Sequence, residues 1–508
     1  MTYNQIPAFH TLSSEDPAIC WDFFVQHYGD EEQAARDPKM TWTNPEGQTF
    51  IGTGTDAPSG SKQNGIYYPR AATPDGCTMH NAMMTFLPPD EDWEDIANLT
   101  GDRSWEPREM RKYFERGHGF DGYLGTSHPD PGLLESMKPF LDAALETAPS
   151  KENGSPAEII HDANAPGTHG REGVVEMVLA ITRKGRRSSP RDYLVSTASA
   201  TNPDGSKKYP QTIRVNSLAT KVLFSSGPTP KAAGVEFLDG AGLYEAAPTC
   251  DPKTGAETKR EFATHEIIIA GGAFNTPQFD IPIAANLPGV GTNLQDNYET
   301  HVLARSPRDI SVLANPSLGA AGDPFLRHWV TEGTGPFSSA GMSWKVHPRN
   351  ERVGTVPLES ADPRRRPAIN FRFFDSRNDR EHDLAAMAEG ISCAREMFAS
   401  AEKMLGPQQE ENPGPEVKDV GAVKQDITDK AFSHHATSTC AIGADDDPLA
   451  CLDSNFNVRG VKRLRVVDAS VFPRVPGAYP VLPIYMVSEK ATDVILNAAK
   501  QSPPVRQC

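Results

Sequence analysis

Apolar residues recur at helical spacing in several stretches of the chain. Spacings of three and four residues predict amphipathic helices, because 3.6 residues complete one turn and bring such positions to one face. In the sequence Met137 and Phe140 belong to such an apolar stripe, so we expect both in the core. The pattern predicts helices over Trp105 to Glu115, Gly132 to Ala148, Asp379 to Ala399 and Leu482 to Lys500.

Short runs of β-branched and aromatic residues predict strands between these helices. The stretch His265 to Ala270 contains three consecutive isoleucines, which is typical of a strand buried on both faces. Strands and helices are interspersed without an internal repeat, so we expect an α/β (α+β) protein. The predicted strands are Thr212 to Val215, Lys221 to Phe224, Ala233 to Phe237, His265 to Ala270, Leu464 to Asp468, and short strands around a proline-rich turn from Arg352 to Asn370.

The first 65 residues are polar and rich in Pro, Gly, Asp and Thr. One helix is predicted here, around Pro17 to Tyr28. The run GTGTDAPSG, residues 52–60, contains closely spaced glycines, but no apolar strand precedes it and Pro58 stands where a helix would have to form. We therefore expect a turn-forming loop and no nucleotide-binding unit.

Composition narrows the range of functions. The chain has 508 residues, a net charge of −17 and no apolar run long enough to span a membrane, so we expect neither a nucleic-acid nor a membrane partner. The basic run Arg183 to Arg187 is interpreted as a solvated loop. Seven scattered cysteines lack metal-ligand spacing, so no metal site is expected. The opening MTYNQIPAFH has no basic or apolar signal region, and no compartment is indicated.

The C-terminal third carries the most specific motifs. They are HHATSTCAIG, residues 434–443, and VKRLRVVDASVFPRVPGAYPVLPIYMVSEKATDVI, residues 461–495. Together they resemble the glucose–methanol–choline (GMC) oxidoreductases. The resemblance implies that His435, four positions before Thr439, is the active-site base, since an imidazole can take a hydroxyl proton near neutral pH. The family's second active-site position, usually His or Asn before Pro, falls on Tyr479.

The same resemblance implies residues that bind FAD. Asp468 and Ala469 match positions along the ribityl and pyrophosphate chain, and Pro480 and Val481 match the turn near the pyrimidine end of the flavin. The block Tyr67 to Ile96 is similar to the family's first signature, in which only Gly76 survives of its LGG glycines. The remaining cofactor positions implied in this way are Cys77, Asn81, Ala82, Met83 and Ala219.

The chain also departs from the family pattern. The strand, GxGxxG turn and helix that receive the FAD pyrophosphate are absent from the sequence, and the helix that normally follows HEIIIAGGAFNTPQ, residues 265–278, is missing. Near residue 116 the chain likewise passes straight from a helix into a later loop. The expected organisation is an atypical N-terminal segment (1–64), an incomplete FAD-binding, Rossmann-like domain (65–300), a substrate-binding domain of an antiparallel sheet with helices (301–430), and a C-terminal return carrying active-site residues (431–500).

The implied function is FAD-dependent oxidation of a small-molecule alcohol, with oxygen or another acceptor taking up the electrons. We expect this reaction to be a step of secondary metabolism. Tyr479 and the methionines Met79, Met83 and Met84 are expected to shape a pocket for an apolar alcohol. Two alternatives stay open at this point. In the first alternative, the chain is a truncated or degenerate GMC scaffold without redox activity. In the second, it is a lyase or cyclase that uses the same scaffold without net hydride transfer.

Overall fold

The computed structural model describes most of the chain. The described residues are 3–118, 124–127, 131–136, 138–147, 159–168, 174–278, 285–307, 320, 322–339, 353–375 and 380–501. The two abrupt junctions expected near residues 116 and 278 lead into residues 119–123 and 279–284, which lie outside the described residues.

The N-terminal part forms an antiparallel sheet. The helix predicted around Pro17 to Tyr28 is wrong, because this stretch contains strand β1, in which Phe23 and Val25 point into the core and pair with β4. Aromatic and β-branched side chains favour such a half-buried strand. The sheet has the order β1-β4-β2-β3. This part comprises η1 (Tyr3–Gln5), η2 (Pro7–Phe9), α1 (His10–Ser14), β1 (Cys20–Val25), α2 (Glu31–Ala34), β2 (Met40–Thr43), β3 (Thr49–Ile51) and β4 (Lys62–Ala71).

Two further sheets organise the middle and the end of the chain. β10 (Ile267–Ile269) and β13 (Leu464–Val466) form a parallel pair, as expected for a Rossmann-like core. β7 (Ser217–Ser225), β8 (Lys231–Asp239) and β9 (Glu257–Phe262) form an antiparallel sheet. The strand predicted over Thr212 to Val215 is wrong, because Asn216 adopts a positive φ of 53° and β7 begins after it. Two-stranded pairs are made by β5 (Ile159–Ile160) with β6 (Val174–Val175), and by β11 (Leu303–Arg305) with β12 (Gln409–Asn412).

Helices surround these sheets. The helices predicted near both ends of the C-terminal half are confirmed as α11 (Arg380–Leu405) and α13 (Val481–Gln501), while the stretch around residue 140 forms α5 (Pro131–Ser136) and α6 (Lys138–Thr147), with Met137 outside the described residues. α13 packs on α4, and α11 packs on α6 and α12. The others are η3 (Gly76–Met79), α3 (Asp90–Thr100), η4 (Arg103–Trp105), α4 (Pro107–His118), α7 (Pro190–Ser199), α8 (Gly272–Asn275), η5 (Thr276–Gln278), α10 (Pro324–Glu332), η7 (Pro336–Ser338), α12 (Val420–Lys430) and η8 (Ala469–Val471).

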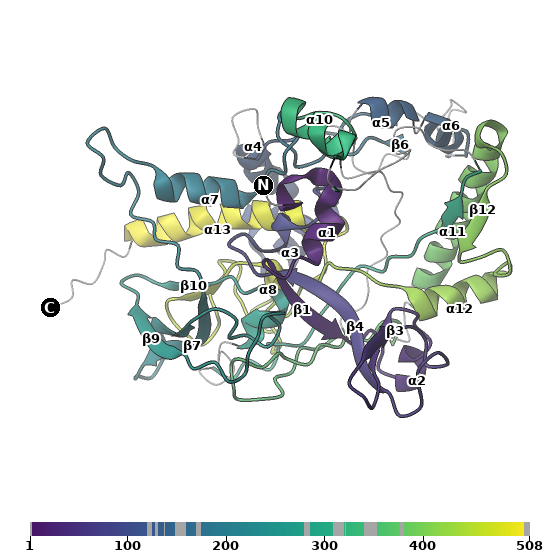
Figure 1. Ribbon diagram of the computed structural model, residues 1–508. Helices are drawn as coiled ribbons and strands as arrows, with labels where there is room; N and C mark the ends of the chain where they lie inside the picture. Colours follow the sequence, from purple (N-terminus) through teal and green to yellow (C-terminus); the bar gives the residue numbers. More distant parts are fainter. Residues whose placement is uncertain are drawn as a thin grey trace.

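Figure 1 shows α11 and α12 at one end of the molecule and the sheet of β7 and β9 at the other. None of the helices in the described ranges is long and apolar enough to cross a membrane.

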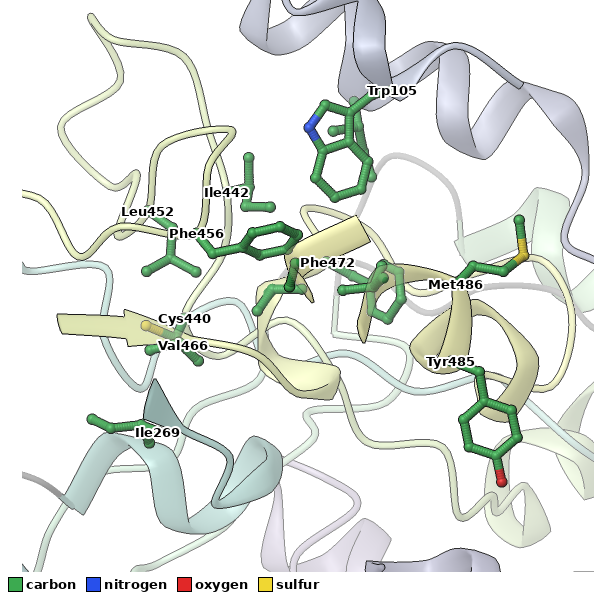
Figure 2. Close-up of a cluster of buried hydrophobic side chains, with 14 of the residues drawn as sticks. Trp105, Ile269, Cys440, Ile442, Leu452, Phe456, Val466, Phe472, Tyr485 and Met486 are labelled. Carbon is green, nitrogen blue, oxygen red and sulfur yellow. The ribbon is translucent and has the colours of Figure 1, made fainter. Parts of the chain in front are cut away.

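Two large hydrophobic cores hold these parts together. We call the first the nucleotide-side core; it surrounds β10, β13 and the first turns of α13, and Figure 2 shows Trp105, Phe456, Val466 and Met486 within it. The second, the substrate-side core, joins the N-terminal sheet to the helices α11 and α12. Ala436 belongs to the second core and Cys440 to the first, so the segment 436–440 crosses from one to the other.

Candidate active site

The backbone around His435 is fixed by residues far away in sequence. The His435 amide donates to Oδ1 of Asp296 at 2.8 Å, and the Ala436 amide donates to the hydroxyl of Tyr68 at 3.0 Å. Thr437 and Gln295 form an antiparallel bridge just beyond. These contacts place His435 at the start of the segment that joins the two cores.

The ring of His435 is held through its Nδ1 atom. Nδ1 lies 2.9 Å from the hydroxyl of Ser433 and 3.3 Å from Oε1 of Glu299. Both neighbours present oxygen atoms to Nδ1, an arrangement that favours the neutral tautomer with its proton on Nδ1 and its lone pair on Nε2. The side chain of His435 is 18% exposed. It is therefore buried enough to be oriented and open enough to meet a small molecule.

Tyr479 lies directly beside this imidazole. The two rings meet edge to face with centroids 5.4 Å apart, and Phe86 approaches Tyr479 from another side at 5.8 Å. Tyr479 precedes α13, whose first amides, at Val481 and Leu482, have no acceptor within the helix. The two residues that the motif assigned to catalysis thus come together next to a helix N-terminus.

A buried carboxylate contacts the backbone of His435. Asp296 is fully buried, and its Oδ2 accepts from the hydroxyl of Tyr68 at 2.8 Å. Burial raises the pKa of Asp296 to about 7, although hydrogen bonds from Ser433 and Tyr68 act in the opposite direction. Asp296 is thus able to change its charge near neutral pH.

The loop expected to wrap the flavin has an open backbone. Gly76 and Met83 both have positive φ, at 66° and 61°, and no atom lies within 4 Å of the position of a Cβ on Gly76. Oδ1 of Asn81 accepts from the Met83 amide at 3.1 Å, while Ala82 is partly buried between them. Burial would raise the pKa of Cys77, but the Arg70 and His80 side chains beside it lower it to about 6.

Arg187 was missed at the sequence level. The interpretation of Arg183 to Arg187 as a solvated loop is wrong for this residue, which is only 5% exposed. Its Nη1 donates to Oδ1 of Asn81 at 2.7 Å and to the carbonyl of Thr78 at 2.9 Å, and its Nη2 is buried without a hydrogen-bond partner. Burial lowers the pKa of Arg187 to about 10. A buried cationic donor therefore underlies the loop expected at the flavin.

The predicted residues at the end of β13 are already engaged within the protein. Asp468 accepts four hydrogen bonds, from the Gly272 amide at 2.9 Å, the Thr276 hydroxyl at 2.6 Å, and both donors of Ser470 at 2.7 and 2.5 Å. Its carboxylate therefore fixes the turn into α8. The structure buries Ala469 beside it.

The other predicted cofactor residues lie on different elements. Pro480 and Val481 are partly buried at the start of α13. Met83 shares the nucleotide-side core with Leu482, so the flavin loop and the start of α13 pack on the same core. Ala219 pairs with Phe237 in the β7-β8-β9 sheet, apart from the parallel pair. Glu299, Asp296 and Ser433 had no assignment from the motifs, although the first two stand in or next to the GVGTNLQD element that resembles the family.

Family models for the two parts of the GMC oxidoreductases match residues 46–299 and 349–488. The chain belongs to the GMC oxidoreductase family. The resemblance seen in the C-terminal motifs is thereby confirmed, and the chain is an FAD-dependent alcohol oxidoreductase of the GMC type.

Curated relatives include choline dehydrogenases. An oxygen-dependent choline dehydrogenase of Stenotrophomonas maltophilia is 26% identical over 495 residues, which cover 83% of this chain and 80% of that protein. The mitochondrial choline dehydrogenase of Mus musculus is also 26% identical, over 87% of this chain and 78% of its own.

Solved structures share the fold over nearly the whole chain. A formate oxidase from Aspergillus oryzae superposes with a TM-score of 0.71 at 17% identity, covering 98% of this chain and 92% of that one. Pyridoxine 4-oxidase from Mesorbium loti superposes with a TM-score of 0.65 at 18% identity, covering 97% and 91%. The predicted GMC-type α/β (α+β) fold is thus confirmed.

The residues of this chain fit the family's cofactor, FAD. The unpartnered Nη2 of Arg187 is a buried donor that suits an anionic ligand, and the open backbone at Gly76 allows close approach. The amides of Val481 and Leu482 at the start of α13 are suited to donate to the electron-rich edge of the flavin ring. When bound, FAD supplies a two-electron acceptor for the hydride of an alcohol carbon.

Proposed function

We propose that this chain oxidises the CH–OH group of a small-molecule alcohol, with His435 as the base. The observation that carries the proposal is the environment of the imidazole. Ser433 and Glu299 occupy the Nδ1 side, so Nε2 carries the lone pair, on a ring that also packs against Tyr479. An imidazole in this state takes the substrate hydroxyl proton as the carbon–hydrogen bond breaks.

Tyr479 and Phe86 support an apolar, aromatic substrate. The ring of Tyr479 lies between those of Phe86 and His435 in contact order, and together Tyr479 and Phe86 form an aromatic wall at the reacting end. Of the methionines expected there, Met79 and Met83 are buried in the protein, and Met83 is part of the nucleotide-side core. The hydroxyl of Tyr479 serves as a donor to the substrate oxygen, since a phenol with an ordinary pKa near 10 is a poor base at neutral pH.

We assign cofactor binding to the loop 76–83, Arg187 and the start of α13. Asn81, Ala82 and Met83 supply backbone beside the ring system, and Val481 supplies an amide. Arg187 holds the loop through Asn81 and offers Nη2 to a phosphate oxygen. These contacts support binding in a sequence that lacks a GxGxxG turn.

The proposal is tested by the absorption spectrum of the purified chain after incubation with FAD. Bound flavin is expected at a 1:1 ratio, with bands near roughly 370 and 450 nm. Anaerobic addition of benzyl alcohol should bleach the band at about 450 nm, whereas His435→Asn should bleach at least about 100-fold more slowly. Formation of hydrogen peroxide in air identifies oxygen as the acceptor.

The other outcomes separate the alternatives. A flavin-loaded chain that no alcohol in a panel of aromatic, aliphatic and quaternary-ammonium alcohols bleaches would contradict alcohol oxidation and favour non-redox chemistry. A chain that stays colourless with excess FAD would indicate a scaffold without the cofactor.

A further inference from the structure

We propose that Glu299 is a positioning residue for His435, which fixes the imidazole with its proton on Nδ1 and stabilises the ring after it has taken a proton on Nε2. The inference rests on the proposed role of His435 as the base. It assigns a task to a carboxylate that the catalytic motifs do not include.

The backbone places Glu299 alongside the active-site segment. The Glu299 amide donates to the carbonyl of Phe432 at 2.9 Å, and the Phe432 amide donates back to the carbonyl of Glu299 at 3.1 Å. This reciprocal pair is an antiparallel bridge, and it fixes the register between residues 299 and 432. His435 follows three residues later, so the position of the carboxylate relative to the ring is set by the fold.

Burial makes the contact between the two side chains strong. The Glu299 side chain is only 8% exposed and its Oε1 lies 3.3 Å from Nδ1. A carboxylate shielded from water interacts with a neighbouring charge more strongly than one at the surface. A positive charge formed on His435 during proton transfer is therefore stabilised where it arises.

Ser433 completes the arrangement. Its hydroxyl lies 2.9 Å from Nδ1, and the same hydroxyl lowers the pKa of Asp296. The oxygen of Ser433 and Oε1 of Glu299 thus both face Nδ1, the first at hydrogen-bond distance and the second at the distance of an ion pair. With the carboxylate charge and a hydroxyl oxygen on one side, the neutral tautomer with its proton on Nδ1 is favoured.

Other charged or titratable groups also face this ring. Asp296 acts through Ser433, Tyr479 packs on the ring, and His434 is the chain neighbour. Nη1 of Arg70 donates to the carbonyl of His434 at 3.5 Å, and the charge of Arg70 disfavours a second positive charge on the neighbouring His435. Among the carboxylates in the described part of the chain, Glu299 is the one seen in direct contact with the imidazole, so its removal should have the larger effect on protonation of His435.

The test is an NMR titration of the His435 ring in ¹³C-histidine-labelled protein, first without FAD, with His435→Asn used for assignment. In Glu299→Gln, which keeps the size and removes the charge, the titration midpoint of His435 should fall by about one pH unit or more. Glu299→Asp, which keeps the charge at a greater distance, should show a smaller fall. Glu410→Gln removes a carboxylate paired with Arg395 and should leave the midpoint unchanged.

Kinetics of the FAD-loaded enzyme provide a second readout. Glu299→Gln should lower kcat about 10- to 100-fold with little change in KM, and Glu299→Asp should restore part of the loss. The acidic limb of the pH profile should move to lower pH together with the NMR midpoint.

A midpoint in Glu299→Gln within about 0.3 of a pH unit of the native value would overturn the inference. If the Gln variant does not fold, as judged by near-UV circular dichroism, the Asp variant is used in its place. A midpoint that does not fall in Glu299→Asp would then overturn the inference. Failure of the native enzyme to oxidise any alcohol would contradict the proposed function, and the titration without FAD would still decide the contact between Glu299 and His435.

Discussion

Tyr68, Asp296, Ser433 and His435 form one hydrogen-bonded group drawn from three distant parts of the chain. Tyr68 and Asp296 are 228 residues apart in sequence, and Asp296 and His435 are 139 apart. Buried polar groups are stable only when each finds a partner. The group is therefore sensitive to any change in the charge of Asp296.

Stability should fall as the pH rises, because of Asp296. Its pKa is raised from 3.8 to about 7 in the folded chain, so the folded state holds a proton that the unfolded state has lost between these values. The contribution of Asp296 to the free energy of unfolding then decreases from about pH 4 to 7, by at most about 4 kcal/mol. Urea unfolding at several pH values measures this loss.

Asp296→Asn provides the control, since an amide does not titrate. The variant should lose less stability between about pH 4 and 7 than the native chain does. Parallel curves for the two proteins would show that Asp296 is already charged at acidic pH and would contradict the buried, protonated state.

Local motifs located the proposed base and its aromatic neighbour but not their partners. His435 and Tyr479 stand within short motifs that resemble the family, so sequence alone was enough to name them. Glu299 and Arg187 take their roles from contacts made by the fold. Nothing in the basic run Arg183 to Arg187 distinguishes the buried arginine from the exposed ones.

At the scale of elements, the sequence predicted those whose pattern is local. The isoleucines of β10, the core residues of β13 and the apolar stripes of α11 and α13 are visible in short windows. β1 was mistaken for a helix, because its pairing with β4 depends on residues more than forty positions later. Short apolar runs do not distinguish helix from strand without such partners.

Helix α13 offers a matched test of its inward and outward faces. Leu482 is completely buried in the nucleotide-side core, whereas Leu496 on the same helix is 53% exposed. Leu482→Ala should reduce the free energy of unfolding by about 2–5 kcal/mol, because it leaves a cavity. Leu496→Ala should change it by less than about 0.5 kcal/mol. Chemical denaturation measures both, and equal effects would show that α13 packs differently.

At the scale of the whole molecule, the N-terminal sheet and residues more than 300 positions later share the substrate-side core. The Phe371 amide donates to the carbonyl of Gln26 at 2.8 Å, and the ring of Phe371 stacks on Tyr68 of β4 with centroids 5.4 Å apart. The N-terminal sheet is thus covered by residues of the later substrate-side region. The expected boundary at residue 64 separates parts that share one core.

This sharing predicts cooperative unfolding of distant segments. Phe371→Ala should remove about 3–5 kcal/mol of stability and should lower hydrogen-exchange protection in peptides 20–25 and 369–374 together. Peptide 257–262, from the largely exposed strand β9, should be unaffected. Hydrogen-exchange mass spectrometry distinguishes this result from a loss confined to residues near 371, which would contradict a common unit.

The late arrival of Phe371 and Phe373 has a consequence for biosynthesis. Strands β1 and β4 leave the ribosome long before these partners are made, and at about 5–20 residues per second the delay is roughly 15 to 70 s. During that time the aromatic side chains of the N-terminal sheet lack the cover that Phe371 and Phe373 later provide. We expect chaperones that bind apolar segments to assist such a nascent chain, so that a lower culture temperature or added holdase should increase its yield more than a stronger promoter would.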